Sequence, residues 1–268
     1  MFVVPVLFAF AIPFVAAQSN DTAVQIEAIE AHFTQADLVP ELLATFNPSA
    51  ALTINFDGVG DVSPGQALTQ DQVAPTPTIT IMPANSSVSL SGNFTIAMVD
   101  ADIVGANESN ITRHWLVNGV TVTNGQVSNS SATAITSYAG PAPASGSGPH
   151  RYVVILLQQP SSFSPPSDFS QPNIGVSQFD FNGYVKNSQL GPVVAANYFT
   201  VEVGTSTVSV SATSSVQSST LASVSVTKTS SSVAATGTGK AGNAASQAAK
   251  SGLTSIILGV AAMAVVLM

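Results

Sequence analysis

The sequence contains no cysteine, and most of its few charges are negative. Without cysteine the chain can form no disulfide and offers no thiolate as a nucleophile or a metal ligand. A domain without disulfides must be stabilised by its own hydrophobic core, so it cannot be very small. The excess of 14 acidic residues over six lysines and arginines disfavours nucleic acid as a partner. The sequence also indicates no cofactor and no metal site.

The charges are distributed unevenly along the chain. Every acidic residue lies between Asp21 and Glu202, where the only permanent cations are Arg113, Arg151 and Lys186. We therefore expect a strongly acidic folded domain. An anionic ligand of such a domain would need hydrogen-bond donors supplied locally, because the overall field repels it.

The N-terminal segment is almost wholly apolar from Phe2 to Val15 and ends in small residues, Val15-Ala-Ala17. This order is typical of a secretory signal peptide. We predict that residues 1–17 are removed and that the mature chain begins at Gln18. A membrane helix is the alternative, although the apolar stretch is short for one.

The C-terminal segment ends in 253–268, a stretch that carries no charge. A short polar spacer precedes it, and small residues at 242–245 precede the spacer. This order is typical of a glycosylphosphatidylinositol (GPI) anchor signal, although a single membrane-spanning helix remains the alternative. We predict attachment at Asn243, or at Gly242, with 244–268 removed as a propeptide. The protein is then expected on the extracellular face of the plasma membrane, or in the cell wall after transfer.

Between these ends lie two regions of different composition. Ser and Thr make up more than half of 205–236, which has no aromatic residue and one charge, Lys228. Such a segment cannot bury a core, so 205–243 is predicted to be a disordered, O-glycosylated stalk. The preceding region, 18–204, is predicted to be the single folded domain.

The folded region alternates short apolar runs with Gly/Pro turns, which predicts a mainly β sandwich or barrel-like domain with few helices. A helix is expected at 21–33, capped by Asn20 or Asp21, and a short one within 183–190. The expected strands are 52–56, 75–82, 88–90, 94–99, 113–118, 120–122, 134–137, 152–157 and 199–203.

Polar residues follow the apolar part of one of these strands. Because side chains alternate along a strand, five residues share one face: Phe94, Ile96, Met98, Asp100 and Asp102. The same rule predicts a second shared face, made by His150, Tyr152, Val154 and Leu156. On a third strand, it places His114 on the same face as Leu116. If the three strands are neighbours, two carboxylates, two imidazoles and a phenol gather at their ends.

Two blocks of sequence carry a family resemblance. The first is Asp100-Ala-Asp102 followed by Arg113-His-Trp-Leu-Val-Asn118, and the second runs from Tyr138-Ala-Gly-Pro through Gly148-Pro-His-Arg-Tyr152 to Gln159. Both resemble the conserved blocks of the phosphatidylethanolamine-binding protein family, and the resemblance extends over about Ile26 to Val203. It implies an antiparallel β-sandwich with a few short helices.

The resemblance also implies a pocket for an anion, and it assigns the ligand-binding residues: Asp100, Asp102, His114, Gly140, Pro143, His150 and Tyr152. The backbone N–H groups of the 140–148 loop could add an anion-binding nest. The implied ligands are phosphate, a phospholipid headgroup or a carboxylate. Because some relatives inhibit a serine peptidase, such a secreted enzyme is a further predicted partner. The alternative is a structural wall mannoprotein with a vestigial pocket.

One departure from the family pattern concerns the loop after Asp100. The prolines that are usual there are replaced by Ala101 and by Ile103-Val104. Proline restricts φ and permits a cis bond, so we expect this loop to be looser than the family norm, or shaped differently.

Catalysis is not predicted. Ser145 or Ser147 could form a Ser-His-Asp set with His150 and Asp100, but the chain lacks a Gly-x-Ser-x-Gly nucleophile elbow. Nor does the spacing of histidine and carboxylate residues match a known metal motif.

Six Asn-x-Ser/Thr sequons predict N-glycosylation at exposed sites, which are Asn20, Asn85, Asn93, Asn107, Asn110 and Asn129. Asn107 and Asn110 are expected on a surface loop near the pocket rim.

Overall fold

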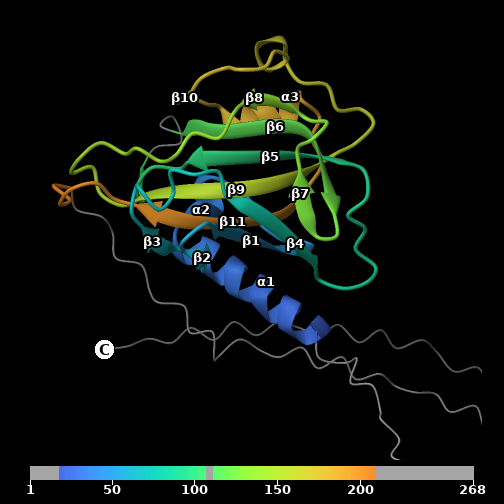
Figure 1. The fold of residues 1–268 in the computed structure, drawn as a ribbon, viewed down its shortest axis with the longest axis horizontal. Coiled ribbons are helices and arrows are strands. Elements are labelled where there is room, and N and C mark those ends of the chain that lie inside the picture. The colour runs from blue at the N-terminus through green and yellow to red at the C-terminus, as the bar shows by residue number, and fades with distance from the viewer. Residues whose placement is uncertain (1–17, 107–110, 209–268) are drawn as a thin grey trace, which may run out of the picture. The chain divides into compact units, whose positions relative to one another are not determined.

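The computed structural model describes residues 18–106 and 111–208, with side chains described from Thr22 onward. The predicted signal peptide and anchor signal, and the predicted stalk beyond Val208, lie outside these ranges. Within them, no helix has the length and hydropathy needed to cross a bilayer. Figure 1 shows the elements in place. The helices are α1 (Gln18–Gln35), α2 (Leu38–Glu41), the 3-10 turn η2 (Ser167–Phe169) and α3 (Phe181–Asn187).

The strands form one curled sheet in the order β2-β1-β4-β7-β6-β5-β9-β11-β3. Neighbours pair antiparallel, except for the parallel pair β11–β3, and β8 and β10 both pair with β6. The strand bounds are β1 Ala50–Phe56, β2 Gly60–Asp61, β3 Gln66–Leu68, β4 Thr78–Pro83, β5 Asn93–Asp100, β6 Thr112–Thr123, β7 Gln126–Ser128, β8 Thr133–Thr136, β9 His150–Gln159, β10 Ser177–Gln178 and β11 Val193–Val201.

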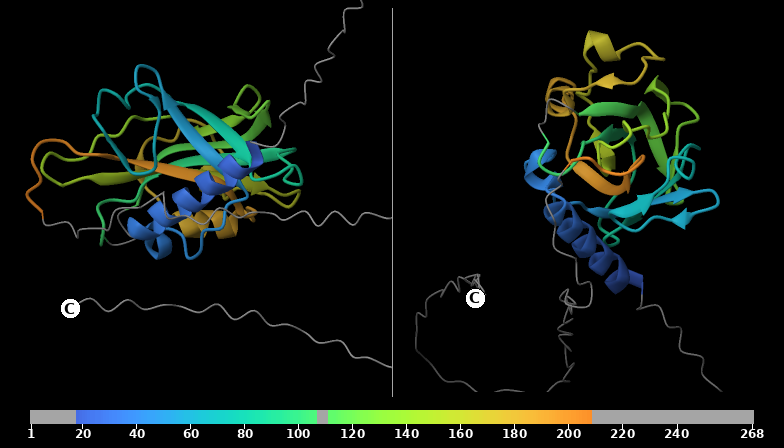
Figure 2. Two further views of the ribbon diagram at one scale, coloured as in Figure 1. Left: turned by 90° about the horizontal axis from the view of Figure 1, so that it is seen from below. Right: turned by 90° about the vertical axis from the view of Figure 1, so that its left-hand side faces the viewer.

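Curling of the sheet produces two hydrophobic cores (Figure 2). The inner core lies between the facing halves of the sheet and contains Met98, Trp115 and Tyr152. The outer core lies between the sheet and the helices and contains Phe33 and Phe181. Strands β5 and β9 are buried on both faces because they contribute to both cores. The mainly β fold and the faces predicted within these two strands are therefore confirmed. Asp102, predicted on the same face as Asp100, instead lies beyond the end of β5 with a left-handed φ of 59°.

Several expected boundaries are wrong. Helix α1 begins at Gln18, so neither Asn20 nor Asp21 is its N-cap. Residues 88–90 form no strand. The runs expected as separate strands at 113–118 and 120–122 are one twelve-residue strand, β6, because Gly119 adopts a φ of 82° and forms a bulge without ending the strand. Strand β11 begins at Val193, six residues earlier than expected.

A second bulge in β6 determines where His114 points. Met98 of β5 pairs with Trp115, whereas the next residue, Val99, pairs with Arg113, so His114 is the extra residue. At a bulge the alternation of side chains is interrupted. His114 contacts the inner-core residue Tyr152, whereas Leu116 packs in the outer core. The prediction that His114 shares a face with Leu116 is therefore wrong, and the bulge brings His114 to the other predicted site residues.

Asn197 links the two halves of the curled sheet. From β11 its side-chain amide donates to the backbone oxygens of Leu52 (3.0 Å) and Val62 (3.4 Å), and all of these groups are buried. We expect Asn197→Ala to lower the free energy of unfolding by about 1–3 kcal/mol, because it leaves buried carbonyls without a donor. Urea denaturation followed by circular dichroism measures the change.

Asn55→Ala is the matched control for this prediction. Asn55 also donates an amide hydrogen bond, to Asp61, but at an exposed position. Its loss should change stability by less than about 0.5 kcal/mol. Equal losses in the two variants would show that Asn197 is no special link between the halves.

Candidate functional site

The centre of the site is the contact between Asp100, at the end of β5, and His150, at the start of β9. His150 Nδ1 lies 3.1 Å from Asp100 Oδ1 and 3.0 Å from Oδ2. The register of the two strands produces this contact, since Asp100 pairs directly with Tyr152, two residues after His150. The sequence prediction that Asp100, His150 and Tyr152 gather at the strand ends is confirmed.

The second ring nitrogen of His150 contacts Ser147. His150 Nε2 lies 2.9 Å from Ser147 Oγ, whose own proton is donated to Ala144 O at 2.7 Å. Ser147 Oγ therefore accepts from Nε2, while Nδ1 donates to the Asp100 carboxylate, so both nitrogens carry a proton. Burial alone would lower the pKa of His150, but the hydrogen bond to Asp100 and the charges of Asp100 and Asp102 raise it. These contacts and the raised pKa favour the imidazolium form of His150.

The other imidazole of the site is held in the neutral form. His114 Nδ1 lies 3.1 Å from Ala139 O, which can only accept, so Nδ1 carries the proton. Burial lowers the pKa of His114, and the bond to Ala139 and the charge of Asp100 offset this only in part. Nearby His150 adds to the lowering. The two histidines therefore have different roles, a cation and a neutral ring.

Tyr152 lies between these groups and is fully buried. Its ring packs edge-on against His114, with centroids 5.3 Å apart, and stacks on Phe199. Its hydroxyl lies near the Asp100 carboxylate and the backbone of Ala142, but it makes no hydrogen bond of regular geometry to a described residue. Burial, followed by the charge of nearby Asp100, raises the pKa of Tyr152, and the backbone of Ala142 acts in the opposite direction. Tyr152 therefore offers a neutral O–H group beside the carboxylate.

The remaining predicted site residues have different surroundings. Asp102 adopts a left-handed φ of 59°, and its Oδ1 lies 3.6 Å from His150 Nε2. Pro143 is buried. Gly140 packs closely against the backbone around Ala74, so that a Cβ on Gly140 would lie 3.1 Å from the Cα of Ala74. Gly140 therefore permits close packing of two loops, and a direct role in binding a ligand remains a prediction.

The 140–148 loop is only partly available as an anion nest. Two of its backbone N–H groups, those of Gly146 and Ser147, donate within the fold to Val203 and Ala144. The loop is also covered by a C-terminal strap, which we define as Thr205–Val208. Thr207 donates to Gly146 O from its backbone N and from its Oγ1, each at 2.9 Å. The first four residues of the predicted stalk therefore pack on the loop that carries Ser147.

The Asp100–Ile103 loop is held by several hydrogen bonds, and its looseness or shape relative to other family members stays a prediction. Asp102 N donates to Asp100 Oδ1 at 2.7 Å, and Ala101 N donates to Arg151 O at 2.8 Å. The Arg151 guanidinium donates to three consecutive carbonyls of this loop, those of Ala101, Asp102 and Ile103. It also donates to Ala36 O and pairs with Glu41 at 2.8 Å. Donors from Arg151 therefore hold this turn, which lacks the prolines expected from the family resemblance.

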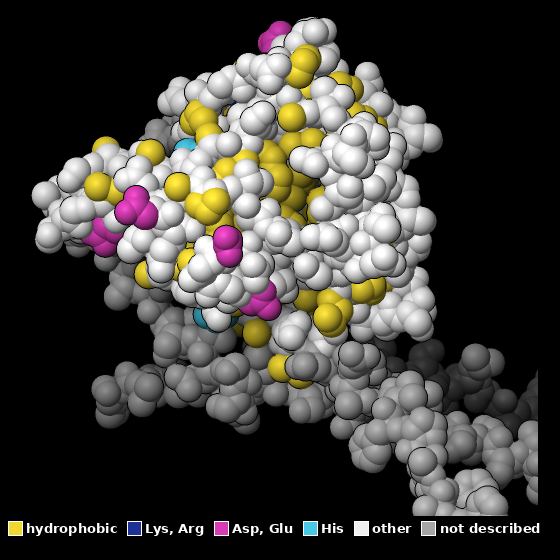
Figure 3. Space-filling model, in the orientation of Figure 1, with side chains coloured by type: hydrophobic (Ala, Val, Ile, Leu, Met, Phe, Trp, Pro, Cys, Tyr) yellow, Lys and Arg dark blue, Asp and Glu magenta, His cyan; other side chains and the backbone are white. Residues whose placement is uncertain are grey.

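Positive charge is scarce at the surface. Both arginines are buried, and of the permanent cations among the described residues only Lys186 is exposed. The face in Figure 3 accordingly shows acidic side chains and no visible lysine or arginine. Among the described residues, no three histidine or carboxylate side chains are grouped to hold a metal ion. Any anion must therefore rely on donors within the site.

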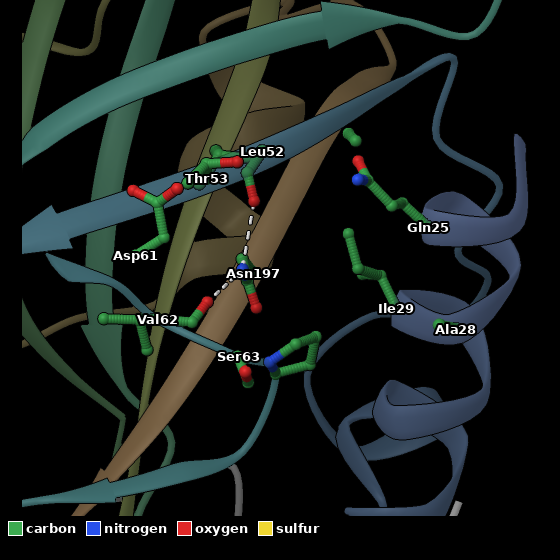
Figure 4. A pocket seen from close by; sticks show the side chains of 11 residues that line it. Gln25, Ala28, Ile29, Leu52, Thr53, Asp61, Val62, Ser63 and Asn197 are labelled. Carbon is green, nitrogen blue, oxygen red and sulfur yellow. Dashed lines mark hydrogen bonds between the residues drawn. The ribbon is translucent and has the colours of Figure 1, made fainter. Parts of the chain in front are cut away.

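Two cavities lined by described residues lie away from this site. The first, about 240 Å³, separates α1 from β1, with Gln25 and Ile29 facing Leu52 and Thr53 (Figure 4). The hydrogen bonds of Asn197 run along its wall. The second, about 170 Å³, lies near Trp115. None of the seven predicted ligand-binding residues lines either cavity.

The fold and the polar cluster define a curled β domain with a buried site at its strand ends. A family model described as phosphatidylethanolamine-binding protein matches residues 58–201, more than half of the chain. The chain therefore belongs to the phosphatidylethanolamine-binding protein family, as its sequence blocks predicted.

Individual relatives are distant. CEN-like protein 1 of Nicotiana tabacum is 27% identical over 169 residues, which cover 62% of this chain and 89% of that protein. The 26 kDa secreted antigen of Toxocara canis is 28% identical over 178 residues, 62% of each chain. The carboxypeptidase Y inhibitor of Saccharomyces cerevisiae is 23% identical over 209 residues, 66% and 94% of the two chains.

A solved structure has the same fold. The crystal structure of carboxypeptidase Y inhibitor complexed with the cognate proteinase superposes with a TM-score of 0.55 at 22% identity. The match covers 66% of this chain and 96% of that one. Membership of the family supports a binding role for the domain, and the solved structure shows that the fold is shared.

The sequence analysis missed two contributors to the site. Arg151 carries a charge within an otherwise apolar strand, and that contrast could have indicated a buried structural role. Ser147 was considered only as a nucleophile, although its position three residues before His150 allows the loop to return it to the ring. Its partner Ala144 and the backbone of Ala139 carry no such signal in the sequence.

The contrast between the two histidines can be tested by an NMR pH titration of the chain's three histidine rings. We expect the pKa of His150 above its ordinary value of 6.5 and that of His114 below it. Asp100→Asn should lower the pKa of His150, because it removes the charge that holds the imidazolium. An unchanged His150 pKa in that variant would contradict the proposed pairing.

The same pairing predicts a pH dependence of stability. A raised pKa in the folded state means that His150 contributes stability below its unfolded pKa of about 6.5 and loses it as the pH rises through the folded pKa. The stability advantage of wild type over Asp100→Asn should therefore shrink as the pH increases above about 6.5. Urea unfolding of both proteins from about pH 6 to about pH 9, in steps of roughly one pH unit, measures how this advantage changes.

Arg151 can be tested by Arg151→Lys. Lysine keeps the charge for Glu41 but has no planar fork for the loop carbonyls, so we expect a loss of about 2–4 kcal/mol and a shifted His150 resonance. The matched control is Arg113→Lys at the other buried arginine, which packs on Phe169 and Phe179. The control should also destabilise the fold but leave the His150 resonance in place. Equal shifts in both variants would contradict a specific role for Arg151.

Proposed function

We propose that the domain binds a dipolar headgroup, as in phosphorylethanolamine, at the cluster formed by Asp100, His114, His150 and Tyr152. The observation that carries the proposal is the Tyr152 hydroxyl, which is fully buried beside the Asp100 carboxylate yet makes no hydrogen bond of regular geometry to a described residue. A buried hydroxyl without a partner costs about 1–3 kcal/mol, and a ligand oxygen would recover that cost.

The charges of the cluster favour a ligand that carries both signs. The Tyr152 hydroxyl can donate to a phosphate oxygen, and His150 can attract the phosphate by its positive charge, although both of its N–H groups are already donated to Asp100 and Ser147. The carboxylates of Asp100 and Asp102 suit an ammonium group. Phosphate alone would be opposed by two carboxylates and balanced by one cation. Phosphorylethanolamine supplies its own cation, so we expect it to bind more tightly than phosphate.

The location is proposed from the ends of the chain. Residues 1–17 have the pattern of a signal peptide, and 242–268 have the pattern of a GPI-anchor signal. One relative is named a secreted antigen, which agrees with an extracellular site. We therefore propose that the domain is displayed on the outer face of the plasma membrane, or in the wall.

Specific observations support two further candidate roles. Likeness to the carboxypeptidase Y inhibitor in sequence and fold supports inhibition of a secreted serine peptidase as a second candidate. The internal pairing of Asp100 with His150 supports the alternative, a structural wall mannoprotein with a vestigial pocket. A peptidase inhibition assay and a ligand titration separate these roles, because the structural role predicts neither activity.

Hydrolysis is not proposed, although Ser147, His150 and Asp100 lie in the order of a catalytic triad. A triad needs a neutral histidine that accepts the serine proton. Here His150 is held as an imidazolium and the Ser147 proton is donated to Ala144 O. We expect a fluorophosphonate probe to leave Ser147 unlabelled at pH 7, as judged by mass spectrometry. Labelling that disappears in Ser147→Ala would overturn this conclusion.

The binding proposal is tested by Tyr152→Phe in calorimetric titrations with phosphorylethanolamine. We expect about a tenfold loss of affinity together with equal or higher stability, because the variant removes an unpaired buried hydroxyl. Tyr138→Phe is the matched control, since its hydroxyl donates to Val73 O outside the cluster. The control should keep its affinity but lose about 1 kcal/mol of stability. Absence of binding by the wild-type domain would favour the structural role.

Affinity for phosphate should depend on pH through both histidines. As pH rises above about 6.5 and through the raised pKa of His150, the site loses its cation and affinity should fall. The pKa of His114 lies below about 6.5, so this ring becomes protonated only as the pH falls further. Its added positive charge should then raise the affinity for phosphate. Titrations with phosphate at about pH 5 and about pH 8, which lie roughly on either side of the pKa values of the two histidines, test this. Equal affinities would exclude both rings from the site.

A further inference from the structure

The cavity near Trp115 has an apolar floor and a polar rim. Its volume is about 170 Å³, enough for roughly six water molecules. Buried Trp115 and Ile96 contribute to the floor, and exposed Thr76, Thr78, Gln126 and Asn129 contribute to the rim. Figure 3 shows a hollow of this character near β7, with hydrophobic side chains at its base and polar or backbone atoms around it.

This arrangement matches the chemistry of a pyranose sugar. One face of such a ring presents C–H groups, which pack against an aromatic side chain, while its edges carry hydroxyl and amide groups. Threonine and glutamine side chains at the rim can form hydrogen bonds with those edge groups. A cavity of this size accommodates one ring and not an extended chain.

The rim residue Asn129 begins the sequon Asn129-Ser130-Ser131. It lies in the turn between β7 and β8, where Ala132 N donates to Asn129 O at 3.1 Å. The three sequon residues are exposed. Asn129 can therefore be reached by a modifying enzyme, and a sugar attached to it would begin at the cavity.

We propose that the cavity seats the first N-acetylglucosamine of a glycan carried by Asn129. The inference rests on the proposed secretion of the chain, because N-glycans are added to secreted proteins. Attachment keeps the sugar at the rim, so even weak contacts suffice to fill the cavity, as for any tethered ligand. The seated ring covers Trp115 and ties the β7–β8 turn to the inner core.

The proposal can be tested by fluorescence, because Trp115 is the only tryptophan of the chain. The full chain is produced in a eukaryotic host, and mass spectrometry determines which sequons are occupied. One sample is treated with an endoglycosidase that leaves the first N-acetylglucosamine, and another with an amidase that removes the whole glycan. We expect Trp115 to stay shielded from acrylamide in the first sample and its quenching constant to rise about twofold or more in the second.

Asn129→Gln and Asn85→Gln complete the experiment. Asn85 is also exposed and begins a sequon, but it lines neither cavity. Quenching should rise in Asn129→Gln and stay unchanged in Asn85→Gln. An unmodified Asn129 in a chain glycosylated elsewhere, or equal quenching in the two treated samples, would overturn the proposal. A chain without any N-glycan would instead contradict the proposed secretion and, with it, this inference.

Discussion

The guanidinium of Arg151 is the contact on which the site depends. It joins two regions of the chain that are far apart in sequence: the α1–α2 region, through Ala36 O and Glu41 at the end of α2, and the carbonyls of the turn after Asp100. The planar guanidinium has five N–H donors and can bond to all of these acceptors at once, whereas an ammonium group could not. Since Arg151 follows His150 on β9, the same strand end fixes the turn on one face and the imidazolium on the other.

The polar cluster shows how an acidic domain can offer positive charge and hydrogen-bond donors locally to a negatively charged group. Its two arginines are used internally, so the surface offers almost no attraction at long range. Charge is instead supplied by one histidine, which Asp100 keeps protonated, and by neutral donors that lose little by being buried. Burial lowers the pKa of His114, and its carbonyl partner offsets this only in part. At His150 the carboxylate partner and the nearby charges outweigh burial, which distinguishes the two rings.

Much of this arrangement could be predicted from sequence, for identifiable reasons. The alternation of β5 and β9 is regular, so the face shared by Asp100, His150 and Tyr152 followed from the period of two. His114 was placed on the wrong face because a bulge depends on pairing with β5, which the local sequence does not reveal. The donors that hold the Asp100–Ile103 turn were missed for a similar reason: they come from Arg151, about fifty residues later in the chain. The local sequence pattern therefore sufficed to predict these strands, whereas the chemistry of the site depends on contacts between segments that are distant in the sequence.

The C-terminal strap has a mechanical consequence. Thr207 is fastened to Gly146 by two hydrogen bonds, and Gly146 immediately precedes Ser147, the partner of His150. Tension applied to the chain beyond Val208 would load these two bonds before it reached β11. The first effect of such a force would be to peel the loop away from the imidazolium, while the sheet stayed intact. A domain tethered through this end would thus carry its load across the wall of its own binding site.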